Sequence, residues 1–230
     1  NLSAVNSINW ARAVAQTVYY FRAATKMDNP CDPISFSVPT GNFGNVFAGY
    51  GAKRMGLNIE QLIIGSNSND ILTRFFENGC MEMTGVNPTI SPSMDIQISS
   101  NFERLLFELY GRDSSIVRDM MKEFRETGSY TVDQKVMDQA NALFTAARFS
   151  DQEIRDTINL VFKENNELID PHSAIGVAAG RARRRNPDTP LIELATAHPA
   201  KFPKAVEQAS GQWPSLPDRL SDLFEREERV

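Results

Sequence analysis

A short apolar strand, a glycine-rich turn and an amphipathic helix follow one another between Ser35 and Gly49, and no other stretch constrains the fold as strongly. The turn contains Gly41 and Gly44, and the helical pattern behind it continues to Met55. A strand that passes into a helix through such a turn gathers several backbone N–H groups around one point, where the helix dipole adds partial positive charge. The stretch therefore suits a bound phosphate.

The pattern alone leaves the ligand open. It is not the phosphate loop that needs a Lys after its last Gly, nor the dinucleotide pattern G-x-G-x-x-G. A tight turn between a strand and a helix, with no ligand at all, explains the same glycines equally well.

The order of strand and helix recurs further along the chain. A buried strand is predicted at residues 61–65, a helix at residues 70–78 with Asn69 as its N-cap, and a third apolar strand at residues 191–196. Strands joined by helical crossovers of about 10–12 residues run parallel. Ligands of such sheets bind beyond the carboxyl ends of the strands, where the glycine turn and residues 67–70 both fall. We therefore predict an α/β fold with a parallel twisted sheet and a shared site at this edge.

Separated motifs resemble the threonine synthase family, in the order in which the family has them. They lie at residues 6–12, 40–45, 99–104, 170–176 and 196–202. The similarity covers nearly the whole chain, and the family consists of pyridoxal-phosphate enzymes of the tryptophan-synthase-β-like fold, fold type II. The resemblance implies the carboxyl-terminal large-domain part of such an enzyme, with helices on both faces of the parallel sheet.

The resemblance also implies how the cofactor is held. The residues expected to hold the 5′-phosphate of pyridoxal phosphate are Gly41, Asn42, Phe43, Gly44 and Asn45. Relatives often have Asp at the last of these positions, and the neutral amide of Asn45 suits a dianion at least as well. Thr196 is expected to hydrogen-bond the pyridine nitrogen, although a Thr at a strand end is also a common cap.

A second polar set is predicted to contact the substrate: Asn9, Arg12, Ser100, Asn101 and Arg104. The guanidinium of Arg12 fits phosphate oxygens because it donates two parallel hydrogen bonds. Ordinary roles compete with this prediction, since an Arg often lies along a helix surface and Asn101 can cap the helix that follows it. His172 and His198 have no partner at metal-ligand spacing, so no metal is predicted.

Changes in the pattern of apolar and charged residues divide the chain into three ranges. Residues 1–111 are predicted to be a cofactor-binding part of the large domain, residues 112–169 a helical elaboration packed on it, and residues 170–230 the remainder of that domain. Residues 94–98 alternate like a strand, and residues 216–228 have helical polarity.

The first helix is predicted over residues 4–25. Its apolar residues recur at spacings of three and four, which predicts a buried face that includes Ala11, Ala15, Val18 and Phe21.

No catalytic residue is predicted within the chain. Pyridoxal enzymes need a lysine that forms a Schiff base with the cofactor, and the family has it upstream in a Phe-Lys-Asp-type context that no lysine here matches. The chain begins at Asn1 without an initiator Met and stops after a charged run. We therefore expect a segment of a longer protein that contains half of an active site.

The implied reaction converts O-phospho-L-homoserine and water into L-threonine and phosphate, the work of a carbon–oxygen lyase in amino-acid biosynthesis. Two other functions stay open: another fold type II lyase, such as a threonine dehydratase or a cysteine synthase-like enzyme, and a non-catalytic module that binds a phosphorylated ligand. The first alternative is disfavoured because those relatives use a Ser-Gly-Gly-Gly-type loop, which the chain lacks.

Composition argues against other classes of partner. The net charge of -5 gives no basic surface for nucleic acid. No apolar run approaches the ~20 residues of a membrane span. The two cysteines lie far apart, which favours a reducing, cytoplasmic setting. The expected partner is a small-molecule substrate.

Overall fold

The computed structural model describes residues 9–227, and a parallel sheet lies at its centre. The strands of this sheet are β1 (Ile34–Pro39), β2 (Ile59–Ser66), β5 (Phe144–Arg148) and β6 (Leu191–Glu193). Their order is β5-β2-β1-β6, and every neighbouring pair is parallel. The predicted parallel α/β fold is confirmed.

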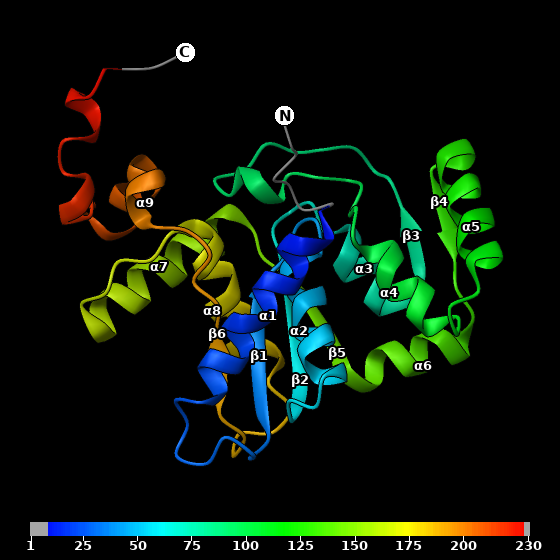
Figure 1. Cartoon of the computed structure of the whole chain (residues 1–230). Helices are drawn as coiled ribbons and strands as arrows, with labels where there is room; N and C mark the ends of the chain where they lie inside the picture. Colours follow the sequence, from blue (N-terminus) through cyan, green and yellow to red (C-terminus); the bar gives the residue numbers. More distant parts are fainter. Residues whose placement is uncertain (1–8, 228–230) are drawn as a thin grey trace.

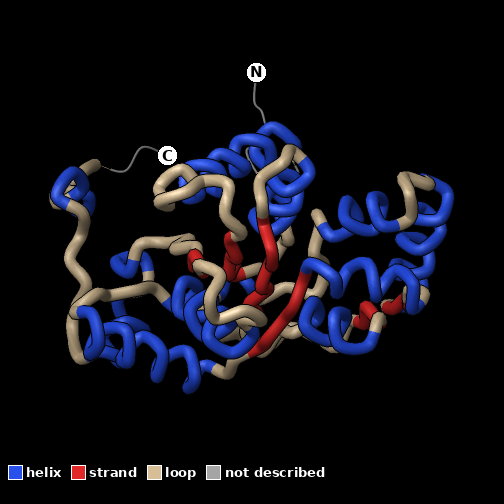
Figure 2. Tube along the Cα trace, turned by 90° about the horizontal axis from the view of Figure 1, so that it is seen from below, coloured by secondary structure: helices blue, strands red, loops and turns tan. Residues whose placement is uncertain are grey.

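Helices cover both faces of the sheet (Figure 1, Figure 2). One face carries α1 (Trp10–Ala24) and α2 (Gly44–Arg54), and the other carries α7 (Asp151–Asn165) and α8 (Pro171–Arg183), with α9 (Pro203–Ser210) packed on α7. A further group lies beside β5: α3 (Ile71–Asn78), α4 (Phe102–Leu109), α5 (Ser114–Thr127), α6 (Gln134–Leu143) and the antiparallel pair β3 (Cys80–Glu82) and β4 (Ser129–Thr131).

The central strand β1 is buried along its whole length because helices pack on both of its faces. Phe36 packs edge-to-face on Tyr20 of α1, with the ring centroids 4.8 Å apart. On the opposite face, the Oγ of Ser37 donates a 2.6 Å hydrogen bond to the carbonyl of Gly176 in α8. A Cβ at Gly176 would lie 3.1 Å from the Cδ of Pro39, so a glycine is what lets α8 approach the end of β1.

The prediction for the first helix is partly wrong. The helix begins at Trp10, with Asn9 as its N-cap, and residues 4–8 of the predicted start lie outside the described residues. Its buried residues are Ala13, Thr17, Tyr20 and Ala24. The face predicted from Ala11, Ala15 and Val18 is exposed, because α1 packs on α2 through the opposite set of side chains, which includes the large Tyr20.

Three other local predictions are also wrong. Residues 112–169 are not wholly helical, because β5 joins the main sheet beside β2 and β4 pairs with β3. Residues 94–98 form no strand; a short 3-10 helix, η1 (Pro92–Met94), leads into an irregular segment. The helical polarity near the end yields only the short 3-10 helices η3 (Asp218–Leu220) and η4 (Leu223–Glu225), and residue 228 is outside the described residues. The division into three ranges stays a prediction.

Candidate functional site

A cleft of about 640 Å³ opens at the carboxyl ends of β1 and β6. These strands are parallel neighbours, so the segments that follow them meet at the same edge of the sheet. The residues that line the cleft come from α1 (Arg12, Gln16, Tyr19), from the loop after β1 (Pro39, Thr40, Gly41, Asn42, Phe43, Gly44, Asn45) and from the segment after β6 (Leu194, Ala195, Thr196). The volume is typical of a small-molecule site.

The loop between β1 and α2 presents backbone donors at the start of a helix. Phe43 is left-handed, with φ of 62°, and α2 begins at the next residue. Successive N–H groups in such a turn form a concave site for an anion. Across residues 9–227, the N–H groups from Gly41 to Asn45 donate to no protein acceptor. The loop therefore has the donors that an anion requires, and the helix dipole supports the same charge.

The left-handed backbone at Phe43 is held in place by its side chain. A non-glycine residue in this conformation costs about 1–3 kcal/mol. The Phe43 ring is only 1% exposed, and it packs edge-to-face on Phe102 at 4.9 Å and near Phe144 at 6.0 Å. Full burial of such a ring contributes about 1.5–3 kcal/mol, which offsets the strain. A hydrophobic anchor thus fixes the shape of a polar loop.

The side chain of Asn45 is oriented by a hydrogen bond from Tyr20 of α1. The Tyr20 hydroxyl donates to the carbonyl of Asn45 at 2.8 Å and to its Oδ1 at 3.2 Å. Burial raises the pKa of Tyr20 far above its ordinary value, so the hydroxyl remains a neutral donor. Because Oδ1 accepts from Tyr20, the Nδ2 donors of Asn45 remain for a ligand in the cleft.

Thr196 reaches the cleft from the segment after β6, which ends at Glu193 and not at Thr196 as predicted. The backbone N–H of Thr196 donates to the Oγ of Ser173 at 3.2 Å. Within the described part of the chain its hydroxyl makes no hydrogen bond with the protein, so the structure gives no support to the capping role. Thr196 is exposed and lines the cleft, so the residue is accessible to a ligand there.

The Ser173 hydroxyl that accepts from Thr196 is itself held by a buried carboxylate at the start of α8. Asp170 caps this helix, and it accepts hydrogen bonds from the N–H of His172 at 2.9 Å, from the Nδ1 of His172 at 2.8 Å and from the hydroxyl of Ser173. Burial by itself raises the pKa of Asp170, but the hydrogen bonds from His172 and Ser173 outweigh it, and the net pKa is lowered. The carboxylate is thus kept charged and fixes Ser173 beneath the Thr196 segment.

Of the five residues predicted to contact substrate, Arg12 lines this cleft and the other four lie elsewhere. The Oδ1 of Asn9 caps α1 by accepting from the N–H of Ala11 at 3.0 Å. Ser100 borders a small separate hollow, and Arg104 lines a different cleft of about 530 Å³ between α1, α2, α4 and α5. Contact between these residues and substrate stays a prediction.

Asn101 is buried, and it occupies the N-cap position of α4 without capping the helix through its side chain. Its Nδ2 instead donates to the carbonyl of Asn42 at 2.9 Å. Neither the predicted substrate contact nor the alternative capping role describes this bond.

Among the cleft residues that the sequence did not predict, two come from α1. Gln16 and Tyr19 line the cleft beside Arg12. They lie four and seven residues after it, which places all three side chains on one face of a helix. This helical spacing is the pattern from which Gln16 and Tyr19 could have been predicted as neighbours of Arg12.

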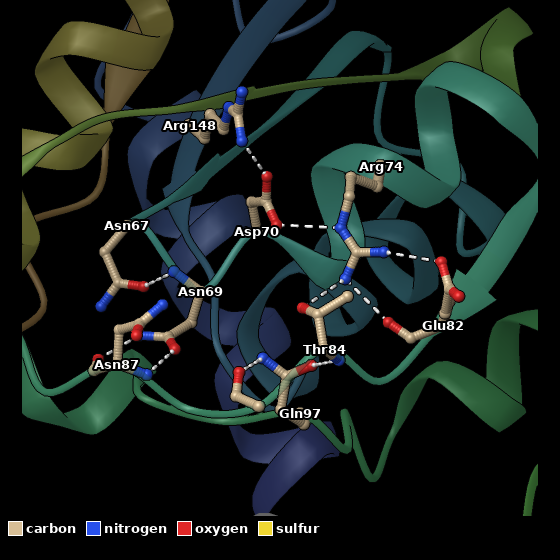
Figure 3. A network of polar contacts seen from close by, with 10 residues as sticks. Asn67, Asn69, Asp70, Arg74, Glu82, Thr84, Asn87, Gln97 and Arg148 are labelled. Atoms are coloured by element: carbon tan, nitrogen blue, oxygen red, sulfur yellow. Dashed lines mark hydrogen bonds and ion pairs between the residues drawn. The ribbon is translucent and has the colours of Figure 1, made fainter. Parts of the chain in front are cut away.

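The polar segment after β2 does not line the cleft, so the expectation of a site shared with it is wrong. The Nδ2 atoms of Asn67 and Asn69 both donate to Asp95, at 2.8 and 2.9 Å. Asp70 binds Arg74 (Figure 3), and the Nε of Arg74 lies 2.9 Å from the Oδ1 of Asp70. Asn67 and Asn69 thus hold the long segment before α4 against the sheet, whereas Asp70 joins Arg74 of α3 to Arg148 of β5.

A parallel α/β sheet with a cleft and a donor loop at its carboxyl edge is the architecture of proteins that bind small ligands at strand ends. The family described as "Threonine synthase, C-terminal" matches residues 173–230. The threonine synthase of Pseudomonas aeruginosa is 51% identical over 229 residues, which cover 99% of this chain and 49% of that protein.

Solved structures agree with this match. The structure of threonine synthase from Brucella melitensis, described as bound to pyridoxal phosphate, superposes with a TM-score of 0.95 at 54% identity, over 99% of this chain and 49% of that one. Yeast threonine synthase superposes with a TM-score of 0.91 at 38% identity, over 99% of this chain and 50% of that one. This chain is similar to threonine synthases over nearly its whole length, and the predicted fold type II architecture is confirmed. It spans about half the length of the curated relatives it matches.

Proposed function

We propose that the full-length protein is a threonine synthase, which converts O-phospho-L-homoserine and water into L-threonine and phosphate. This chain supplies the part of the active site that holds the phosphate of pyridoxal phosphate. The observation that carries the proposal is the row of N–H groups from Gly41 to Asn45, which have no protein acceptor among residues 9–227. The name of the Pseudomonas aeruginosa relative, which is 51% identical, supports the reaction.

The cleft offers a hydrogen-bonding partner for each of the two polar ends of the cofactor. The loop donors suit the 5′-phosphate dianion, and the Nδ2 of Asn45 adds a side-chain donor there. The hydroxyl of Thr196 is a neutral partner for the pyridine nitrogen, which it leaves largely unprotonated. When bound, pyridoxal phosphate supplies an electron sink for the carbanions that form at Cα and Cβ of the substrate.

Arg12 is our candidate for the phosphate of the substrate. It lies on α1 and lines the same cleft as the segment that carries Thr196. Its guanidinium stabilises the charge on a phosphate group as that group leaves Cγ of the substrate. Gln16 and Tyr19, one and two turns further along α1, provide neutral polar groups beside it.

The lysine that bonds to the cofactor is proposed to lie outside this chain. No lysine of the described residues lines the cleft. The cytoplasm as the compartment, and the absence of nucleic-acid and membrane partners, belong to the same proposal. Across residues 9–227, no helix has both the length and the apolar character needed to cross a membrane.

Borohydride reduction of the full-length protein with pyridoxal phosphate, followed by peptide mapping, tests the proposal. The loaded protein is expected to absorb near ~410–420 nm, as lysine-bound pyridoxal phosphate does. The reduced cofactor should map to a lysine outside residues 1–230, and the protein should form L-threonine from O-phospho-L-homoserine. A label on a lysine of this chain would overturn the half-site assignment. Cofactor binding without product would favour a binding module or another lyase.

A further inference from the structure

The carbonyl oxygens of the phosphate loop are hydrogen-bonded from behind by the segment before α4. The carbonyl of Gly41 accepts from the Oγ of Ser99 at 2.9 Å. The carbonyl of Asn42 accepts from the backbone N–H of Asn101 at 3.1 Å and from its Nδ2 at 2.9 Å. Three donors from one short segment therefore hold two consecutive peptide groups of the loop.

This bonding determines where the loop donors point. In a planar trans peptide, the C=O of one residue and the N–H of the next point in opposite directions. A carbonyl of Gly41 held by Ser99 turns the N–H of Asn42 the other way. In the same manner, the bonds from Asn101 to the carbonyl of Asn42 turn away the N–H of Phe43. Rotation of either peptide would present a carbonyl oxygen, and not a donor, to an anion.

Asn101 is itself held in a single orientation. It is 1% exposed, and its Oδ1 accepts from the Nε of Arg104 at 3.0 Å. Arginine only donates hydrogen bonds, so the oxygen of the amide must face Arg104 and the Nδ2 must face the loop. The guanidinium of Arg104 lies over the ring of Trp10, 5.3 Å from its centroid.

We propose that Ser99, Asn101 and Arg104 are positioning residues that turn the N–H groups of Asn42 and Phe43 toward the cofactor phosphate. The inference rests on the proposed function of the loop. It gives Asn101 and Arg104 a role different from the substrate contact that the family resemblance implied. The two roles differ in a measurable way, because a positioning residue acts on the cofactor before any substrate is present.

Pyridoxal phosphate titrated into the full-length apoprotein, without substrate, tests the inference. Asn101→Ala is expected to weaken binding by about 3- to 10-fold, the equivalent of one lost hydrogen bond at a site that needs it, and Ser99→Ala by a smaller factor. The ³¹P signal of the bound cofactor should shift in both variants. Asn58→Ala is the control, because it removes a bond between the same kinds of group, from Nδ2 to the carbonyl of Cys31 at 3.0 Å, at the exposed residue that precedes β2.

The outcomes separate the two proposals. If the wild-type protein binds no pyridoxal phosphate, the proposed function fails, and this inference fails with it. If the wild type binds and Asn101→Ala shows the same affinity and ³¹P signal, with a raised KM for O-phospho-L-homoserine, only the inference is overturned in favour of substrate contact. Should Asn101→Ala not fold, judged by circular dichroism, Ser99→Ala applies the same criterion to the N–H of Asn42.

Discussion

Replacing Gly41 with Ala should damage the phosphate loop by direct contact. An added Cβ would lie 2.9 Å from the carbonyl oxygen of Ser93 and 3.4 Å from the Cα of Met94. Both are backbone atoms, which cannot rotate aside as a side chain does, so the loop itself must move by a few tenths of an ångström. Overpacking of this kind costs ~1–3 kcal/mol. If the whole cost falls on the bound state, the affinity for pyridoxal phosphate drops about 5- to 150-fold.

Gly51→Ala in α2 is the matched control for this prediction. Its Cβ would meet only the Cγ2 of Thr17, at an ordinary distance of 3.8 Å, and alanine in a helix interior stabilises by about 0.5–1 kcal/mol relative to glycine. The assay is cofactor titration of the full-length protein, alongside thermal unfolding followed by circular dichroism. Gly41→Ala with the affinity and melting temperature of the wild type would show that the loop is not packed as described.

Thr196→Ala is expected to keep the cofactor bound but to alter its absorption spectrum and slow turnover, because one neutral hydrogen bond contributes ~1 kcal/mol; a wild-type spectrum and rate would refute the contact. Acid should destabilise the protein through Asp170, whose folded-state pKa is lowered. Its stabilising charge is fully present above the ordinary pKa of about 3.9 and is lost as the pH falls through the lowered folded value. Asp170→Asn should flatten this part of the acid dependence and cost ~1–3 kcal/mol at neutral pH, both measured by urea unfolding. An unchanged acid dependence would show that the charge of Asp170 does not stabilise the folded protein.

The part of the fold that could be predicted from the sequence follows from local rules. The strand, turn and helix predicted between Ser35 and Met55 lie in the structure between Ile34 and Arg54, and they could be predicted because glycine spacing and apolar periodicity act over a few residues. The capping box of α7, formed by Ser150 and Glu153, is another local pattern of the same kind. The parallel pairing of β1 with β2 could be predicted because a helical crossover between two strands is typical of parallel neighbours.

The parts that were missed depend on contacts between distant residues. The strand β5 (Phe144–Arg148) contains two alanines and directly follows α6, so its pairing with β2 leaves no local signal. The buried face of α1 depends on its fit to α2, and the hydroxyl of Tyr20 serves Asn45, which lies 25 residues away. Asn101 could be recognised as part of a motif, but its bond to the carbonyl of Asn42 becomes visible only in the folded chain.

A crystal structure of the full-length protein with pyridoxal phosphate bound would test most directly whether this loop holds the cofactor. The phosphate is predicted to accept hydrogen bonds from the N–H groups between Gly41 and Asn45, with the pyridine nitrogen facing the hydroxyl of Thr196. The carbonyls of Gly41 and Asn42 should still be bound by Ser99 and Asn101. A phosphate seated elsewhere, or one that faces the loop carbonyls, would contradict the assignment.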